Sequence, residues 1–128
     1  MSSNITLSFE MESDRHIWIV ALLKAERLKA VWDNDDLAAE VQFWKGDPIK
    51  TWFRDEALSE LKLAKAYYSQ RGISFANGRH RTRWLLQQGY EHIPVMLLPG
   101  SFVEAMLDGI LVRPAMFGDV LIHNTASS

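Results

Sequence analysis

The stretch from Ile73 to Leu98 constrains the fold of this chain more than any other segment. A short apolar run meets an Asn-Gly pair at Asn77 and Gly78, an arginine-rich segment follows, and Gly89 precedes a second apolar run. Asn-Gly tolerates the left-handed backbone that a tight turn often needs, and a glycine commonly ends a helix. The segment therefore predicts a strand, a tight turn, a helix and a second strand in direct succession.

The other elements are predicted from hydrophobic periodicity and from capping residues. Ser101 is the expected cap of the last helix, with Glu104 completing a capping box. Leu28–Trp32 fits a strand or a helix. Strands are predicted at Ile5–Glu10, His16–Leu23, Ile73–Phe75 and His92–Leu98, and helices at Asp35–Trp44, Asp55–Tyr68, Gly78–Gln88 and Ser101–Leu107.

This order of elements predicts an α+β fold, with a small mixed sheet packed against helices. A length of 128 residues suits one domain with a sizeable core. Residues from about 110 to 128 contain Pro114 and Gly118, and we expect them to be irregular.

Composition excludes several classes of protein. The longest apolar runs are too short to cross a bilayer, so no membrane insertion is expected. The N-terminus lacks the layout of a secretion signal, and the chain has no cysteine, which fits a cytoplasmic protein and rules out thiolate chemistry. Its four histidines show no metal-binding spacing, so no metal site is predicted.

Charge is unevenly distributed along the sequence, although the net charge is only −2. Residues 1–60 hold twelve acidic and seven basic residues, whereas residues 61–128 hold four acidic and seven basic ones. A local basic face could attract phosphate, and an acidic face could attract a basic partner. Alternatively, the two halves interdigitate and the asymmetry disappears in space.

The arginine-rich helix start is the most informative candidate site. Arg79, His80 and Arg81 would fall in the first helical turn, and no Asp or Glu occurs between Arg71 and Tyr90. Cations at this end oppose the helix dipole by roughly 0.3–1 kcal/mol each. They make sense if an anion such as phosphate binds there, because the turn also offers outward backbone N–H groups.

Two interpretations of this segment remain open. In the first, it binds phosphate through Asn77, Gly78, Arg79, His80, Arg81 and Arg83. In the second, Arg79 and Arg83 bond to local carboxylates such as Glu91, and Arg81 is a buried strut.

Catalysis would require a carboxylate close to the turn, to hold a metal or to activate water. The segment itself supplies none, so an acid such as Glu56 would have to approach in space. His80, Arg81 and Glu56 are the candidate catalytic residues on this basis, and whether the protein is an enzyme stays open.

The segment resembles the motif of the ParB/sulfiredoxin superfamily. ParB-type proteins carry a strand, then Gly-Glu-Arg-Arg-x-Arg, a helix ending in glycine, and a strand with Val-Pro-Val. Here Gly78–Arg83 reads Gly-Arg-His-Arg-Thr-Arg, Gly89 stands at the family's second glycine, and Ile93–Val95 reads Ile-Pro-Val. Sulfiredoxin carries Phe-Gly-Gly-Cys-His-Arg, and this chain has arginine at the cysteine position.

Within the superfamily the chain is most similar to the plasmid fertility inhibition factors. The shared features are Trp-Ile-Val at Trp18–Val20 and Phe-x-Asn-Gly-Arg-x-Arg-Thr at Phe75–Thr82. Those factors suppress conjugative DNA transfer, and hydrolysis of nucleotides and cleavage of DNA are attributed to the fold. The resemblance thus implies a ParB/sulfiredoxin-like domain over residues 1–128 that binds ATP or another nucleotide, alone or with Mg²⁺, or the DNA backbone.

Two departures from the family pattern limit what carries over. The missing cysteine excludes the reductase chemistry of sulfiredoxin, and Arg79 replaces the ParB glutamate that would help to hold magnesium. We therefore expect a plasmid- or phage-type inhibitor of DNA transfer with at most a weak ATPase or DNase activity. The alternatives are a purely protein-binding inhibitor of a host or competitor defence machine, and a stand-alone ATPase or nuclease.

Overall fold

The computed structural model describes residues 4–8, 17–32, 48–69 and 72–122. In chain order its elements are β1 (Asn4–Ser8), β2 (Ile19–Lys24), α1 (Ala25–Trp32), the 3-10 helix η2 (Lys50–Trp52), β3 (Glu60–Lys62), β4 (Ala64–Ser69), β5 (Gly72–Asn77), α2 (Arg79–Gln87), β6 (His92–Leu97), α3 (Pro99–Leu107), β7 (Leu111–Pro114) and β8 (Val120–Ile122).

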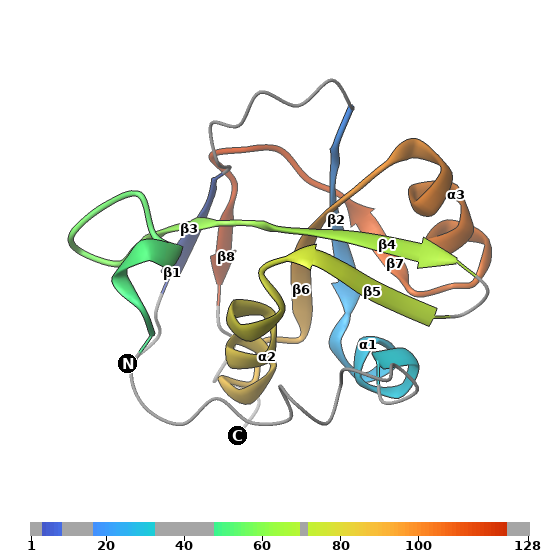
Figure 1. The fold of residues 1–128 in the computed structure, drawn as a ribbon, viewed down its shortest axis with the longest axis horizontal. Coiled ribbons are helices and arrows are strands. Elements are labelled where there is room, and N and C mark those ends of the chain that lie inside the picture. Colours follow the sequence, from blue (N-terminus) through green and yellow to red (C-terminus); the bar gives the residue numbers. More distant parts are fainter. Residues whose placement is uncertain (1–3, 9–16, 33–47, 70–71, 123–128) are drawn as a thin grey trace.

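The strands form two mixed sheets. The larger sheet has the order β5-β4-β6-β2-β7, in which only β4 and β6 run parallel. The smaller has the order β3-β1-β8, in which β1 is parallel to β3 and antiparallel to β8. In Figure 1, α1 and α2 lie below the strands, and α3 lies at the upper right. The chain is therefore a mixed α+β protein as predicted, with two mixed sheets in place of one.

Two runs of chain join the sheets to each other. Only Leu63 separates β3 from β4, and its N–H donates to the carbonyl of Ser8 at 3.0 Å, which extends the pairing with β1. Figure 1 shows β3 and β4 as one long run across the molecule. β7 and β8 likewise follow one another in the chain and pair with β2 and β1. The two sheets thus share one hydrophobic core.

The core is densest around β2 and β6, whose residues are buried in almost unbroken runs. Such runs occur where both faces of a sheet are covered, so they do not alternate between apolar and polar residues. On one face, Trp32 of α1 stacks at a tilt on Phe75 of β5, with 4.7 Å between the ring centroids. Leu85 and Leu86 of α2 are also buried in this core.

The structure confirms the predicted succession of elements between Ile73 and Leu98. β5, α2 and β6 occupy the expected positions, and β5 and β6 belong to the same sheet with β4 between them. The ambiguous segment Leu28–Trp32 belongs to a helix, which begins three residues earlier at Ala25. The helix expected at Asp35–Trp44 lies outside the described residues.

The prediction of a helix at Asp55–Tyr68 is wrong. A turn follows η2. In it, the Asp55 carboxylate accepts hydrogen bonds from the N–H groups of Ser59 and Glu60 at 3.0 and 2.8 Å. Leu58 has φ of 57°, a left-handed conformation that interrupts any helix. Asp55, which the sequence pattern places at the start of a helix, therefore stabilises a local turn instead.

After this turn the chain is extended through β3 and β4. Leu61 and Leu63 alternate with the half-buried Lys62, which is the period of a strand. Leu58, Leu61 and Tyr68 also recur at helical spacing, and this secondary match is what misled the sequence-based prediction.

Two further predictions need correction. The last helix begins at Pro99, with Leu98 as its cap, and Ser101 is not the cap residue. The Ser101 hydroxyl accepts from the N–H of Tyr68 at 2.9 Å and so extends the sheet beyond the end of β6. Residues 111–114 and 120–122 are strands, where the sequence predicts irregular chain, because β2 and β1 supply the pairing partners.

Candidate functional site

The predicted turn lies at the end of β5, against the first residues of β4. Asn77 accepts a hydrogen bond through its Oδ1 atom from the N–H of Lys65 at 2.9 Å. Gly78 follows with φ of 84° and ψ of 13°, and it is the cap residue from which α2 starts. The side chain of Asn77 therefore replaces a backbone partner for β4 and fixes the turn to the sheet.

Glycine is required at position 78 for two separate reasons. Its φ lies in the left-handed region, which disfavours other residues. An added Cβ would also lie 2.4 Å from the Cβ of Ala64 and 2.6 Å from Nε of Arg81. The Arg81 side chain consequently packs directly against the turn.

The first turn of α2 has no side-chain cap and no acidic residue. Its first backbone hydrogen bond runs from the N–H of Thr82 to the carbonyl of Gly78, and the Thr82 hydroxyl donates to the same oxygen. Backbone N–H groups at the start of any helix point outward along the helix axis, and the dipole favours an anion there. The backbone of this helix start is thus suited to an anion.

The arginines of the segment have contrasting environments. Arg79 is half-buried, and its Nη2 atom donates to the carbonyl of Phe75 at 3.1 Å. Arg81 and Arg83 are buried, and the guanidinium carbon of Arg83 lies 4.2 Å from the centroid of a Trp32 ring. His80 is exposed. The burial of Arg81 agrees with the buried-strut interpretation. Arg79 contacts a carbonyl, and Arg83 contacts an aromatic ring.

Glu56, the candidate acid, is exposed in the turn between η2 and β3. Phe53 and Trp52 of the preceding segment each lie 6.1 Å from Trp84, measured between ring centroids, so this region packs beside the middle of α2. Hydrogen bonds from the side chain of Ser59 and the N–H of Glu60 lower the pKa of the neighbouring Asp55 below its ordinary value of 3.8. Asp55 is thus already engaged in its own turn.

The described residues include no group of three His, Cys, Asp or Glu side chains that could hold a metal. The first turn of α2 likewise offers no carboxylate. The residues of the turn therefore do not fit a Mg²⁺ ion.

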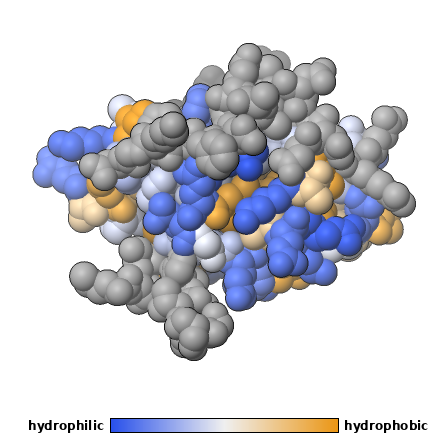
Figure 2. Space-filling model, turned by 90° about the horizontal axis from the view of Figure 1, so that it is seen from below, coloured by the Kyte–Doolittle hydropathy of each residue, from blue (hydrophilic) through white to orange (hydrophobic). Residues whose placement is uncertain are grey.

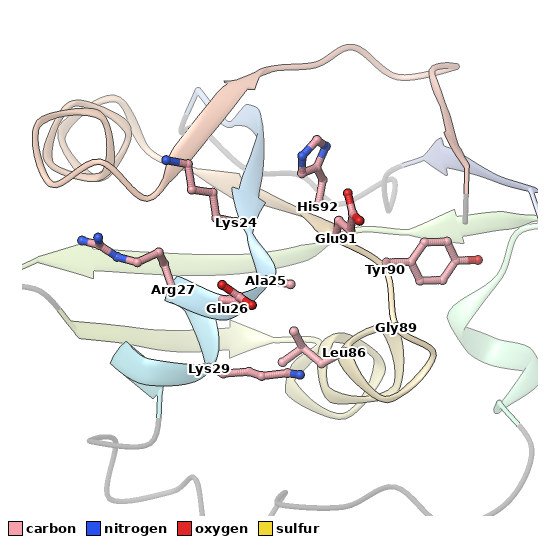
Figure 3. A pocket seen from close by; sticks show the side chains of 10 residues that line it. All are labelled: Lys24, Ala25, Glu26, Arg27, Lys29, Leu86, Gly89, Tyr90, Glu91 and His92. Atoms are coloured by element: carbon pink, nitrogen blue, oxygen red, sulfur yellow. The ribbon is translucent and has the colours of Figure 1, made fainter. Parts of the chain in front are cut away.

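A pocket of about 530 Å³ lies at the opposite end of α2. Figure 3 shows it between the start of α1 and the end of α2, with the start of β6 above. Figure 2 views the molecule from the side of α1 and α2, where hydrophilic residues surround a smaller apolar area. The lining residues are Lys24, Ala25, Glu26, Arg27, Lys29, Leu86, Gly89, Tyr90, Glu91 and His92.

The charges around this pocket nearly balance, with three cations against two carboxylates. Lys24 and Arg27 extend away from α2 in Figure 3, whereas Lys29 extends toward Leu86. Arg27 also donates to the carbonyl of Asp108 at 2.9 Å. Burial raises the pKa of the Tyr90 hydroxyl, so Tyr90 stays neutral over a wider pH range. The lining residues therefore favour neither an anionic nor a cationic ligand.

This pocket was not predicted from the sequence. Its walls come from residues 24–29 and 86–92, which lie far apart in the sequence. The run Lys-Ala-Glu-Arg-Leu-Lys between a strand and a helix was the available signal, and such mixed charge is typical of a solvated helix start.

Comparison of the chain with protein-family models, with curated proteins and with solved structures finds no match. No helix among the described residues is both long and apolar enough to cross a membrane.

Proposed function

We propose that the protein binds phosphate groups of a nucleotide or of the DNA backbone at the start of α2, and that it acts as a mobile-element inhibitor of DNA transfer. The observation that carries the binding site is the helix start itself. A left-handed Gly78 opens α2 without a side-chain cap, and Arg79 and His80 stand in a first turn that lacks acids. The role in DNA transfer, and a cytoplasmic location, rest on the resemblance to the plasmid fertility inhibition factors.

The arrangement of elements supports the likeness to the ParB/sulfiredoxin superfamily. The motif residues join β5 to α2, and α2 leads through Gly89 into β6, which contains Ile93–Val95. β5 and β6 lie on either side of β4 in one sheet. The strand, glycine turn, helix and strand of the family motif therefore have counterparts here in the same order.

The residues of the segment divide into two roles under this proposal. Backbone N–H groups of the first helical turn bind the phosphate, Arg79 contributes positive charge, and His80 offers a hydrogen-bonding side chain. Asn77, Arg81 and Arg83 position the turn, because they bond to β4, pack against Gly78 and stack on Trp32. Of the six candidate residues, only Arg79 and His80 are therefore proposed to contact phosphate through their side chains.

Hydrolysis is secondary in this proposal. The first turn of α2 supplies no carboxylate for a metal or for activating water, and Glu56 is exposed in the turn between η2 and β3. ATP, another nucleotide or the DNA backbone remains the proposed ligand.

The test compares Arg79→Gln with the matched control Arg113→Gln. Arg113 is an exposed arginine of β7, away from the turn, whose Nη1 atom donates to the carbonyl of the adjacent Pro114. Fluorescence anisotropy measures binding of a labelled thymidine oligonucleotide and of a fluorescent ATP analogue at low and high salt. We expect Arg79→Gln to weaken binding and to reduce the salt slope for the oligonucleotide by about 0.7 for each phosphate that is no longer neutralised. Equal behaviour of the two variants, both folded by circular dichroism, refutes a phosphate site at this turn.

An apolar stripe on α3 favours a second candidate function, inhibition by docking on a protein of a transfer or defence machine. Val103, Met106 and Leu107 are 46%, 51% and 78% exposed, and their spacing places them on one face of the helix. Large exposed apolar side chains in a contiguous stripe commonly mark protein contacts. The acidic excess that the sequence shows over residues 1–60 includes Asp35 and Asp36, which lie outside the described residues.

A DNA-transfer assay in cells separates the two functions. Loss of inhibition with Arg79→Gln and retention with Leu107→Ser support the phosphate site. The reverse result supports docking through α3 and makes the turn a structural element only.

A further inference from the structure

The solvent side of α3 is apolar from one end of the helix to the other. The apolar stripe on α3 lies opposite Ala105, which is fully buried against the core. Pro99 and Gly100 are exposed and continue the stripe toward the start of the helix. Glu104, at the margin of the stripe, is the single charged residue between Pro99 and Leu107. A helix that is apolar on both sides is typical of a buried helix, so we expect another surface to cover α3.

Large and small residues are unequally divided along this side of α3. Met106 and Leu107 stand at the end of the helix, and Val103 lies at its middle. At the start of the helix, the position that a Cβ of Gly100 would take has no atom within 4 Å. A second, antiparallel copy of the helix, related by a two-fold axis at Val103, places the large side chains of each copy over the open start of the other.

The charges of the helix favour the same arrangement. The first turn of α3 has no side-chain cap and no acidic residue. In an antiparallel pair, Glu104 of one copy approaches the first turn of the other, where the helix dipole favours a negative charge. A parallel pair would instead align the two dipoles and place the two Glu104 side chains at the same level. The page of contacts therefore matches a second copy of this chain in one orientation.

We propose that the protein forms a symmetric dimer through the apolar stripe on α3, with the two helices antiparallel. In Figure 1, α3 lies at the upper right and α2 lies below the strands, so the pairing leaves the start of α2 uncovered in both copies. The contact is small beside the roughly 800 Å² per partner of a standard interface, so the dimer should dissociate in the micromolar range. The dimer does not depend on the proposed phosphate site.

Sedimentation equilibrium of the full chain, from about 1 to about 500 µM, measures the dimer. The key comparison is Leu107→Ser with Met116→Ser, because Leu107 is 78% exposed and Met116, in the loop between β7 and β8, is 73% exposed. Leu107→Ser should weaken the dimer about tenfold or more, because both copies lose a buried side chain, and Met116→Ser should leave it unchanged. Val103→Glu places two carboxylates on the axis and should give a monomer.

Two further variants test the orientation of the helices. Glu104→Gln should weaken the dimer about 2- to 5-fold, because the contact with the partner's dipole is lost. The chain has no cysteine, so Val103→Cys introduces a single thiol. A short bismaleimide should cross-link Val103→Cys into a covalent dimer, because the axis brings the two side chains together, and Met116→Cys should stay uncross-linked.

Each result either supports or overturns the dimer, with the fold of every variant verified by circular dichroism. A monomer at every concentration overturns it, and if Leu107→Ser then abolishes inhibition in the DNA-transfer assay, the stripe belongs to a protein of the transfer machine. A dimer that survives both Leu107→Ser and Val103→Glu uses another surface, which also overturns the proposal. If Glu104→Gln has no effect and Val103→Cys does not cross-link, the antiparallel pairing is wrong.

Discussion

The turn at Asp55 and the turn at Gly78 both lead into secondary structure, and they satisfy their backbone in opposite ways. In the first, the Asp55 carboxylate accepts from the N–H groups of Ser59 and Glu60 and also from the Ser59 hydroxyl. In the second, the backbone of Gly78 starts α2 without a side-chain cap, and cations follow where acids are favourable.

This difference shows which local features carry information about function. A turn whose own carboxylate accepts from its N–H groups needs no other anion, so the Asp55 turn is structural. The start of α2 places favourable positions for negative charge beside Arg79 and His80, although an acidic residue there would stabilise the helix. An anion from outside the chain, as proposed, would complement the backbone of this helix start.

The largest effect on stability is expected from Gly78→Ala. The added Cβ would overlap Ala64 and Arg81 and would force a left-handed backbone on alanine. Together these terms should lower the free energy of unfolding by roughly 2–4 kcal/mol. Gly109→Ala is the matched control, because Gly109 has φ of +79° with no atom within 4 Å of its Cβ position.

Urea denaturation measures both variants. Gly109→Ala should lower the free energy of unfolding only by the cost of a left-handed alanine, about 1 kcal/mol. Similar losses in the two variants would show that close packing at Gly78 contributes little, and the turn would be less rigid than its contacts indicate.

A smaller effect is expected from Asp55→Asn, which weakens the hydrogen bonds of the other turn. The pKa of Asp55 is lowered in the folded protein, so the stability it contributes is present above pH 3.8 and is lost as the pH falls below that value. Urea midpoints should therefore differ between the variant and the unmodified protein at pH 7, and this difference should shrink as the pH falls below 3.8. The exposed neighbour Glu56 provides the control Glu56→Gln, for which a shift as large as that of Asp55→Asn would exclude this explanation.

The smallest change in stability is expected from His80→Glu, which should change helix stability and phosphate binding in opposite directions. An acid at this exposed position in the first turn should stabilise α2 by about 0.3–1 kcal/mol. The same charge should repel phosphate and abolish oligonucleotide binding at low salt. A stabilised variant that still binds at full affinity would show that the helix start is not the anion site.

Local patterns were sufficient to predict the strand, turn, helix and strand between Ile73 and Leu98. The Asn-Gly pair and Gly89 mark the ends of α2 through backbone conformations that hardly depend on the rest of the chain. β7 and β8 escaped prediction because their pairing partners, β2 and β1, lie some ninety or more residues earlier in the chain. The helix predicted at Asp55 failed because capping acids and turn acids are the same residue types.

The candidate site also combines features that local sequence predicts with features that depend on contacts between distant residues. The sequence located the turn and its cations, but it could not reveal that Arg83 lies on Trp32, a residue from the first third of the chain. The same holds for the packing of Arg81 against Gly78 and Ala64, which depends on how closely β4 approaches the turn. The contact between the rings of Tyr67 and Trp18 was also missed, because it joins β4 to the residue before β2.

The uninterrupted run from β3 through Leu63 into β4 has a consequence for hydrogen exchange. The Leu63 amide bonds to Ser8 of β1, while the next residue, Ala64, pairs with Val95 of β6. Local opening of the small sheet would have to separate neighbouring residues that are held by different sheets. Amides of β1 should therefore exchange with the same free energy of opening as those of β4, so that both sheets open as one cooperative unit.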